Sequence, residues 1–299
     1  MLYYCKTPEG NFGDDLNPWL WSRLAPEVCD ESDPRLFIGI GTILSHRIPS
    51  EGIKIVLGAG CGYSKPPVLD SKWRIYAVRG PLTAARLKLD SNLALTDPAM
   101  LVRKFPNPSG AKTFPISFMP HHQSMLNANW VNLCSRASIH CIDPRNPVEK
   151  VLSEIQQSEV LLAEAMHGAI VADALRVPWV AVRMYSQFLD FKWNDWSQSI
   201  NVPLTVATIP PVSTNPLAWR RQMVHRWKRV WSKTFLGKAK WRSLPVRVSK
   251  EYEISETLRL LGNVVTKHSP HLSDDRTLAR VEERLLEKVS ELRSHWRQQ

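Results

Sequence analysis

Short apolar segments alternate with longer amphipathic stretches over the first two thirds of the chain. Each apolar segment ends at or near Gly, Pro or Asp, as buried strands do, and the stretches between them repeat apolar residues at helical spacing. This alternation predicts an α/β fold built on parallel sheets. The predicted strands are residues 2–6, 36–39, 54–57, 74–78, 114–119, 139–143, 160–163 and 179–182.

Three predicted helices begin at a proline, which suits the first turn of a helix, and span 18–24, 81–89 and 147–157. A cluster of Pro, Asn, Ser and Gly at 105–110 reads as a linker between two sets of strands. Near Pro216 the alternation gives way to a basic helical region that ends in a mixed-charge helix at 277–299. We therefore expect two α/β units, at 1–108 and 109–212, and a helical tail at 213–299.

The composition fits a folded, enzyme-sized protein. Of the 299 residues, 43% are hydrophobic and 22% are charged, which is too apolar for a disordered segment. The net charge is +11, but eleven Lys or Arg and no Asp or Glu lie between Trp196 and Lys250, so the basicity is local. The five cysteines show no C-x-x-C spacing, which argues against a disulfide framework or a zinc site and favours a reducing compartment.

No apolar leader opens the chain, and no window approaches the roughly 20 apolar residues that a membrane-spanning helix needs. These two features predict a cytoplasmic protein, either soluble or peripheral at the inner face of the plasma membrane.

Gly-containing turns follow several predicted strands, and in open α/β sheets ligands bind beyond the carboxyl ends of strands. None of these turns is a full G-x-G-x-x-G, so a dinucleotide site is only weakly indicated. The most informative turn follows the strand at 160–163 and places His167 at the start of a small-residue helix. A helix N-terminus favours anions, and imidazole transfers protons near neutral pH, although a structural histidine would fit there too.

Five segments occur together in one order, and they are, in sequence, Asn11-x-Gly13-Asp14-x-Leu16, Arg79-Gly80-Pro81-x-Thr83, Asp97-Pro98-Ala99, Met166-His167-Gly168-Ala169-Ile170 and Lys192-Trp193-x-Asp195-Trp196-x-x-Ser199. In this set residues 1–200 resemble the polysaccharide pyruvyl transferase family, and most closely its exopolysaccharide ketal-pyruvate branch. The resemblance implies two Rossmann-like domains facing across a cleft, similar to the GT-B glycosyltransferases. It also implies phosphoenolpyruvate as the donor, a glycan or polyprenyl-linked oligosaccharide as the acceptor, and no cofactor or metal.

Ketal formation needs an acid, a base and cations, and the motifs offer candidates for each. We expect His167 to protonate the donor and Asp14, in the first strand-end turn, to act as the base, with Asp97 a weaker candidate for the base. The expected substrate-binding residues are Asn11, Arg79, Asp97, His121, His122, Arg183 and Lys192.

Several of these residues have a structural alternative. Arg79 could cap a helix or pair with an acid on the surface, and Glu164 could either hold His167 protonated or lie on a solvated turn. Many family members carry an Arg two positions before the His-Gly pair, where this chain has Ala165. Either Arg183, Lys192 or another cation would then supply the phosphate contact, or donor binding would be weaker than usual.

In the basic region Trp219, Trp227 and Trp231 share one predicted helical face, and Arg220 and Lys228 lie off it. This pattern is typical of an interfacial helix on an anionic membrane, or of a helix packed on the catalytic body with a solvated basic side. Nucleic-acid binding is not expected, because no nucleic-acid module accompanies the cations.

Two other functions fit the same α/β pattern. One is a glycosyltransferase that uses a nucleotide sugar. The other is a non-catalytic, membrane-associated scaffold of polysaccharide assembly, which the alanine at position 165 keeps open.

Overall fold

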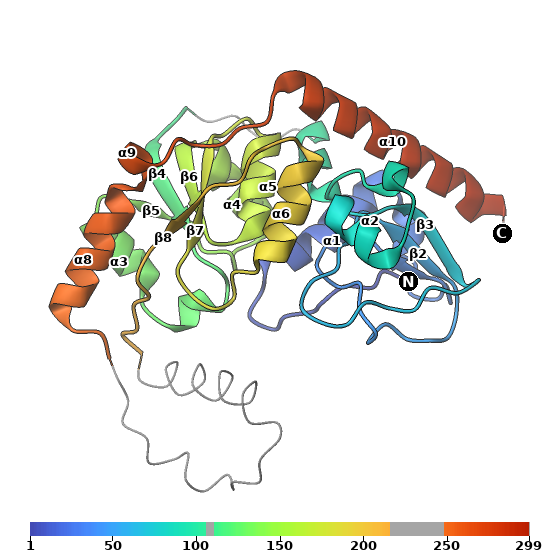
Figure 1. The fold of residues 1–299 in the computed structure, drawn as a ribbon, viewed down its shortest axis with the longest axis horizontal. Coiled ribbons are helices and arrows are strands. Elements are labelled where there is room, and N and C mark those ends of the chain that lie inside the picture. The colour runs from blue at the N-terminus through green and yellow to red at the C-terminus, as the bar shows by residue number, and fades with distance from the viewer. Residues whose placement is uncertain (106–110, 216–247, 299) are drawn as a thin grey trace, which may run out of the picture.

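A computed structural model describes residues 1–105, 111–215 and 248–298. It has a mixed α/β fold with two parallel sheets, which confirms the predicted α/β class (Figure 1). The GT-B-like arrangement of two domains and the basic helical extension stay predictions. The first sheet has the order β1-β2-β3, with strands Leu36–Ile38, Lys54–Leu57 and Trp73–Ala77. The second has the order β5-β4-β6-β7-β8, and in chain order its strands are Phe114–Met119, His140–Cys141, Ser158–Ala163, Trp179–Arg183 and Val206–Thr208.

A layer of helices lies between the two sheets (Figure 1). It contains α1 (Phe12–Leu24), α2 (Pro81–Leu87), α4 (Val148–Gln156), α5 (Met166–Ala174) and α6 (Asp190–Ser199). Helix α1 comes early in the chain but packs on α4 and α5 of the second unit, whereas α6 packs on α2 of the first. The layer therefore interlocks the two sheets, and short helices η1 (Pro26–Cys29), η2 (Ser91–Leu93) and η3 (Pro98–Lys104) complete the first unit.

Alternation along the strands of the second sheet divides the core around that sheet in two. Leu161 and Ala163 face the helix layer, whereas Leu162 points to the opposite face of the sheet, because successive strand residues point to opposite sides. That opposite face is covered by α3 (Trp130–Arg136) and α8 (Glu251–Gly262). The remaining helices are η4 (Ser124–Leu126), α9 (Val264–Lys267) and α10 (Asp275–Gln298).

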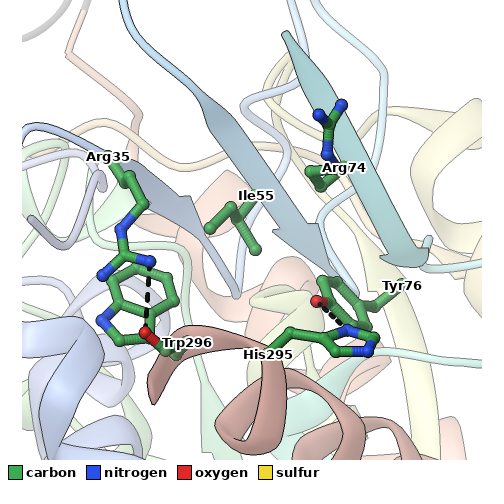
Figure 2. A pocket seen from close by; sticks show the side chains of 6 residues that line it. All are labelled: Arg35, Ile55, Arg74, Tyr76, His295 and Trp296. Carbon is green, nitrogen blue, oxygen red and sulfur yellow. Dashed lines mark hydrogen bonds between the residues drawn. The ribbon is translucent and has the colours of Figure 1, made fainter. Parts of the chain in front are cut away.

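Helix α10 crosses back to the first sheet, although it belongs to the last part of the chain. Close to its end the Trp296 ring lies 4.0 Å from the Arg35 guanidinium, and the Tyr76 hydroxyl is 2.9 Å from His295 Nδ1. Figure 2 shows these side chains around a cavity of about 250 Å³. The helix thus packs on the first unit, and the boundaries predicted at 108 and 212 stay predictions.

Two local predictions are wrong. Residues 2–6 are not a strand: Leu2 alone bridges to β1, because Cys5 and Lys6 are exposed and give the segment no buried face. The first helix begins at Phe12, with Pro18 inside it. Pro18 has no N–H, so it cannot donate the usual helical hydrogen bond to the carbonyl of Asp14, four residues earlier. The side-chain amide of Asn17 donates to that carbonyl instead, at 3.2 Å.

The proposed membrane-contact residues Trp219, Arg220, Trp227, Lys228 and Trp231 lie outside the described residues. Within the described part of the chain, no helix is both long and apolar enough to cross a membrane.

Candidate active site

Helix α1 places Asp14 in its first turn, not in a strand-end turn as the sequence predicts. The Asn11 side chain donates a hydrogen bond to Asp14 Oδ2 at 2.6 Å, and the N–H of Phe12 donates to the carbonyl of Pro144 at 2.7 Å. Burial raises the pKa of Asp14, while the Asn11 hydrogen bond and the charges of His167 and Lys192 act in the opposite direction. Asp14 is therefore a carboxylate of increased basicity that lies near His167 and Lys192.

His167 is the second residue of α5, as its predicted place at a helix start requires. Its Nε2 lies 3.5 Å from Oδ2 of Asp97, and neither atom has a hydrogen bond within the described residues. The other oxygen of Asp97 accepts a hydrogen bond from the N–H of Ala99 at the start of η3. A Cβ at Gly13 would lie 2.1 Å from Nδ1 of His167. The imidazole thus lies between the buried carboxylate of Asp97 and the backbone of Gly13, which carries no side chain.

Lys192, on α6, is 6% exposed. Its ammonium donates to the Tyr63 hydroxyl at 3.0 Å, and it forms no ion pair in the part of the chain that the structure describes. A buried ammonium without a direct ion pair is costly, so the arrangement favours an anionic ligand beside Lys192.

His121 and His122 follow β4, and their ring centroids are 4.3 Å apart. Burial lowers the pKa of both imidazoles, and the charge of Lys192 lowers it further. The pKa of His121 lies well below its ordinary value, and that of His122 is lowered to about 4. Both rings are therefore neutral at pH 7, and each can donate one hydrogen bond and accept another.

Glu164 is 2% exposed, so its interpretation as a residue on a solvated turn is wrong. Its Oε2 accepts a hydrogen bond from the N–H of His121 at 2.9 Å, which connects the end of β6 to the loop after β4. Burial raises the pKa of Glu164 to about 7, against the hydrogen bond from His121 and the charge of Lys192.

This raised pKa predicts how stability changes with pH. Below pH 4.5, the ordinary pKa of Glu164, both states hold the proton; above it the unfolded state loses the proton first, so stability falls until about pH 7. A shift of this size corresponds to about 3 kcal/mol. The depressed pKa values of His121 and His122 have the opposite effect on stability. Below pH 6.5 the unfolded state takes up protons first, so the free energy of unfolding falls as pH falls.

The Glu164→Gln variant, compared with wild type in urea unfolding from pH 4.5 to 7.5, isolates the carboxyl contribution. Its stability relative to wild type should rise with pH, and parallel profiles would show that Glu164 ionises normally. Glu159 is exposed and lies on β6, the strand that ends just before Glu164. The control variant Glu159→Gln should follow the wild-type stability profile.

Arg79 is fully buried, and its guanidinium donates hydrogen bonds to groups inside the protein. Nε donates to Asp195 Oδ2 at 3.1 Å, one terminal nitrogen donates to Thr42 Oγ1 at 2.7 Å, and the other donates to the carbonyl of Cys61 at 3.0 Å. Asp195 also accepts from the N–H and the hydroxyl of Thr83, at 2.8 and 2.6 Å. Arg79 does pair with an acid, but the predicted surface location is wrong, because both side chains are fully buried. Donor binding by Arg79 stays a prediction.

Arg183 lies at the end of β7, where it pairs with the exposed Asp190 and its guanidinium lies 4.8 Å from the Phe188 ring centroid. Its predicted role in binding the donor also remains a prediction.

The fold brings most of the predicted residues to one place: Asn11, Asp14, Asp97, His121, His122, His167 and Lys192. Sequence reasoning did not select Gly13 or Tyr63. Gly13 lies inside a recognised motif and Tyr63 follows a glycine-rich turn, but their roles depend on side chains from other elements.

Residues 51–184 match the family model described as polysaccharide pyruvyl transferase. The chain is 40% identical over 240 residues to the succinoglycan biosynthesis protein ExoV of Rhizobium meliloti (strain 1021), in an alignment that covers 79% of this chain and 74% of the relative. No solved structure matches the chain significantly.

Proposed function

Because the chain belongs to the polysaccharide pyruvyl transferase family, we propose that it moves the enolpyruvyl group of phosphoenolpyruvate onto two hydroxyls of one sugar, as a ketal. The observation that carries the choice of donor is the buried ammonium of Lys192, which forms no direct ion pair in the described chain and whose charge acts on the carboxyl group of Asp14. The similarity to a succinoglycan biosynthesis protein supports an exopolysaccharide, or its lipid-linked repeat unit, as the acceptor.

Lys192 and the first turn of α5 provide the positive potential for the phosphate and carboxylate of the donor. Neutral His121 and His122 add hydrogen-bond donors without further charge. In this proposal the two sheets belong to the two Rossmann-like units of a GT-B-like enzyme. The contact between Tyr63 of the first unit and Lys192 of α6 supports this arrangement.

His167 gives a proton to C3 of the enol, and C2 becomes an electrophilic, oxocarbenium-like centre. Asp97 orients the ring; the 3.5 Å separation is the long form expected of a catalytic contact before the substrate binds. Asp14 takes the proton of the first sugar hydroxyl as its oxygen bonds to C2, and burial strengthens this carboxylate as a base. The C2–O bond to phosphate then breaks, and the second hydroxyl adds to C2 as its proton passes to the imidazole of His167. Free phosphate is the other product and takes up the proton held by Asp14.

The function is tested with purified protein, phosphoenolpyruvate and oligosaccharides extracted from cells that lack this gene, which accumulate the unmodified acceptor. Phosphate release should require the extract, and the product should gain the mass of pyruvate less water. Absence of phosphate release together with thermal stabilisation by a uridine or guanosine nucleotide would favour a nucleotide-sugar glycosyltransferase instead.

Gly13→Ala should lower turnover by about 10²-fold, because displacing a catalytic group by about 1 Å can cost that much. The added methyl would collide with the His167 ring, whose Nδ1 lies 2.1 Å from the new Cβ position. Initial rates of acceptor-dependent phosphate release measure the loss.

Gly262→Ala is the matched control, because a Cβ there meets no atom within 4 Å, and it should retain wild-type turnover. Equal rates for both alanine variants would mean that the approach of His167 to Gly13 is not needed for turnover.

A further inference from the structure

The loop that carries Tyr63 is packed directly against the start of α6. A Cβ at Gly62 would lie 2.4 Å from Cγ2 of Thr42 and 2.9 Å from Cδ2 of Leu189, the residue before α6. Only glycine allows this close approach without a shift of its neighbours. The loop of the first unit is thereby held beside the helix that carries Lys192.

Tyr63 is 57% exposed, although it lies next to a buried ammonium. Lys192 Nζ is 3.0 Å from the Tyr63 hydroxyl oxygen but 5.5 Å from the ring centroid, so it approaches the hydroxyl end of the ring and not its face. Within the described residues, no other aromatic ring packs on Tyr63. Much of Tyr63 is therefore accessible to a ligand, while its hydroxyl end contacts the ammonium of Lys192.

An exposed aromatic face binds the C–H face of a pyranose, because contact removes apolar surface of both from water and the negative ring face attracts polarised C–H groups. The sugar hydroxyls project from the edge of the pyranose and keep their hydrogen bonds. At Tyr63 such a sugar would lie beside Lys192, whose charge acts on both Asp14 and His121.

We propose that Tyr63 forms the acceptor subsite, on which a hexopyranose of the oligosaccharide stacks so that its reacting hydroxyls face the Asp14 and His167 side of Lys192. This inference rests on the proposed function and assigns the two substrates to different residues. Lys192 binds the donor anion, and the ring of Tyr63 binds the acceptor. The hydroxyl of Tyr63 then positions Lys192 without binding the sugar.

Steady-state kinetics of Tyr63→Ala and Tyr63→Phe, with phosphoenolpyruvate and the extracted oligosaccharide, separate the ring from the hydroxyl. Tyr63→Ala should raise the KM for the oligosaccharide about tenfold, as expected for loss of one aromatic contact, and change the KM for phosphoenolpyruvate much less. Tyr63→Phe should keep the oligosaccharide KM within about threefold of wild type, because it retains the ring.

Tyr252→Ala is the matched control. Tyr252 is 67% exposed and has Lys250 5.9 Å from its ring centroid, but it lies on α8, on the outer side of the second sheet (Figure 1). This variant should behave as wild type. An unchanged oligosaccharide KM in Tyr63→Ala, or an equal rise in Tyr63→Ala and Tyr63→Phe, would overturn the subsite.

A binding measurement keeps this test apart from that of the function. Calorimetric titration of water-soluble oligosaccharide from the same extract compares wild type with Tyr63→Ala without turnover. If wild type releases no phosphate, the proposed function fails, and the subsite still stands or falls with the titration. Weaker binding by Tyr63→Ala supports the subsite, and equal binding overturns it.

Discussion

Replacing His167 with Ala should reduce turnover by 10²- to 10⁴-fold, the usual contribution of a general acid or base. Alanine leaves nothing on the first turn of α5 that can protonate C3 of the enol, whereas Lys192 remains to bind the donor anion. The loss should therefore appear in kcat, with a much smaller change in the KM for phosphoenolpyruvate. Acceptor-dependent phosphate release at saturating donor measures it.

His268→Ala is the control for this experiment, because His268 ends α9 on the outer side of the second sheet. It should show wild-type kinetics. If His167→Ala keeps turnover within about tenfold of wild type, the proton for C3 comes from another group.

Removing the carboxylate of Asp195 should destabilise the protein by about 3–5 kcal/mol, because it leaves the Arg79 guanidinium buried without a counter-ion. The N–H and the hydroxyl of Thr83 lose their acceptor as well. Urea unfolding of Asp195→Ala measures the change as a shift of the midpoint. Glu291→Ala removes a partly exposed partner of Lys288 on α10, and as a control it should change stability by less than about 1 kcal/mol.

A double variant tests the physical cause. Arg79→Met combined with Asp195→Ala removes both charges of this pair, so it should recover part of the stability that Asp195→Ala loses. A free energy of unfolding of Asp195→Ala within about 1 kcal/mol of wild type would show that the buried pair is not needed for stability. A double variant no more stable than Asp195→Ala would show that the unpaired charge of Arg79 is not the cause of the loss.

The Arg79–Asp195 pair also explains why a motif residue from the first unit matters to the second. Asp195 lies on α6 one turn after Lys192, and the pair joins that helix to the turn before α2. A Cβ at Gly80 would lie 1.9 Å from the carbonyl oxygen of Asp195, so the glycine of this motif permits the contact. Arg79 thus helps to set the position of Lys192.

The sequence by itself determined the α/β class, most of the strands and the start of α5. Strands at 54–57 and 114–119 have the predicted bounds, because a buried strand shows its pattern in a few consecutive residues. Asp14 was assigned to a strand-end turn although it lies in the first turn of α1, because the side-chain amide that compensates for Pro18 has no periodic signal.

Only the tertiary structure decided what the charged residues contact. Arg79 meets Asp195 across 116 positions and Lys192 meets Tyr63 across 129, distances at which no local pattern specifies a partner. The burial of Glu164 and the return of α10 to the first sheet depend likewise on how the layers pack. Local periodicity reports which face of an element avoids water, whereas the partner of a buried charge is set by elements that come together only when the chain folds.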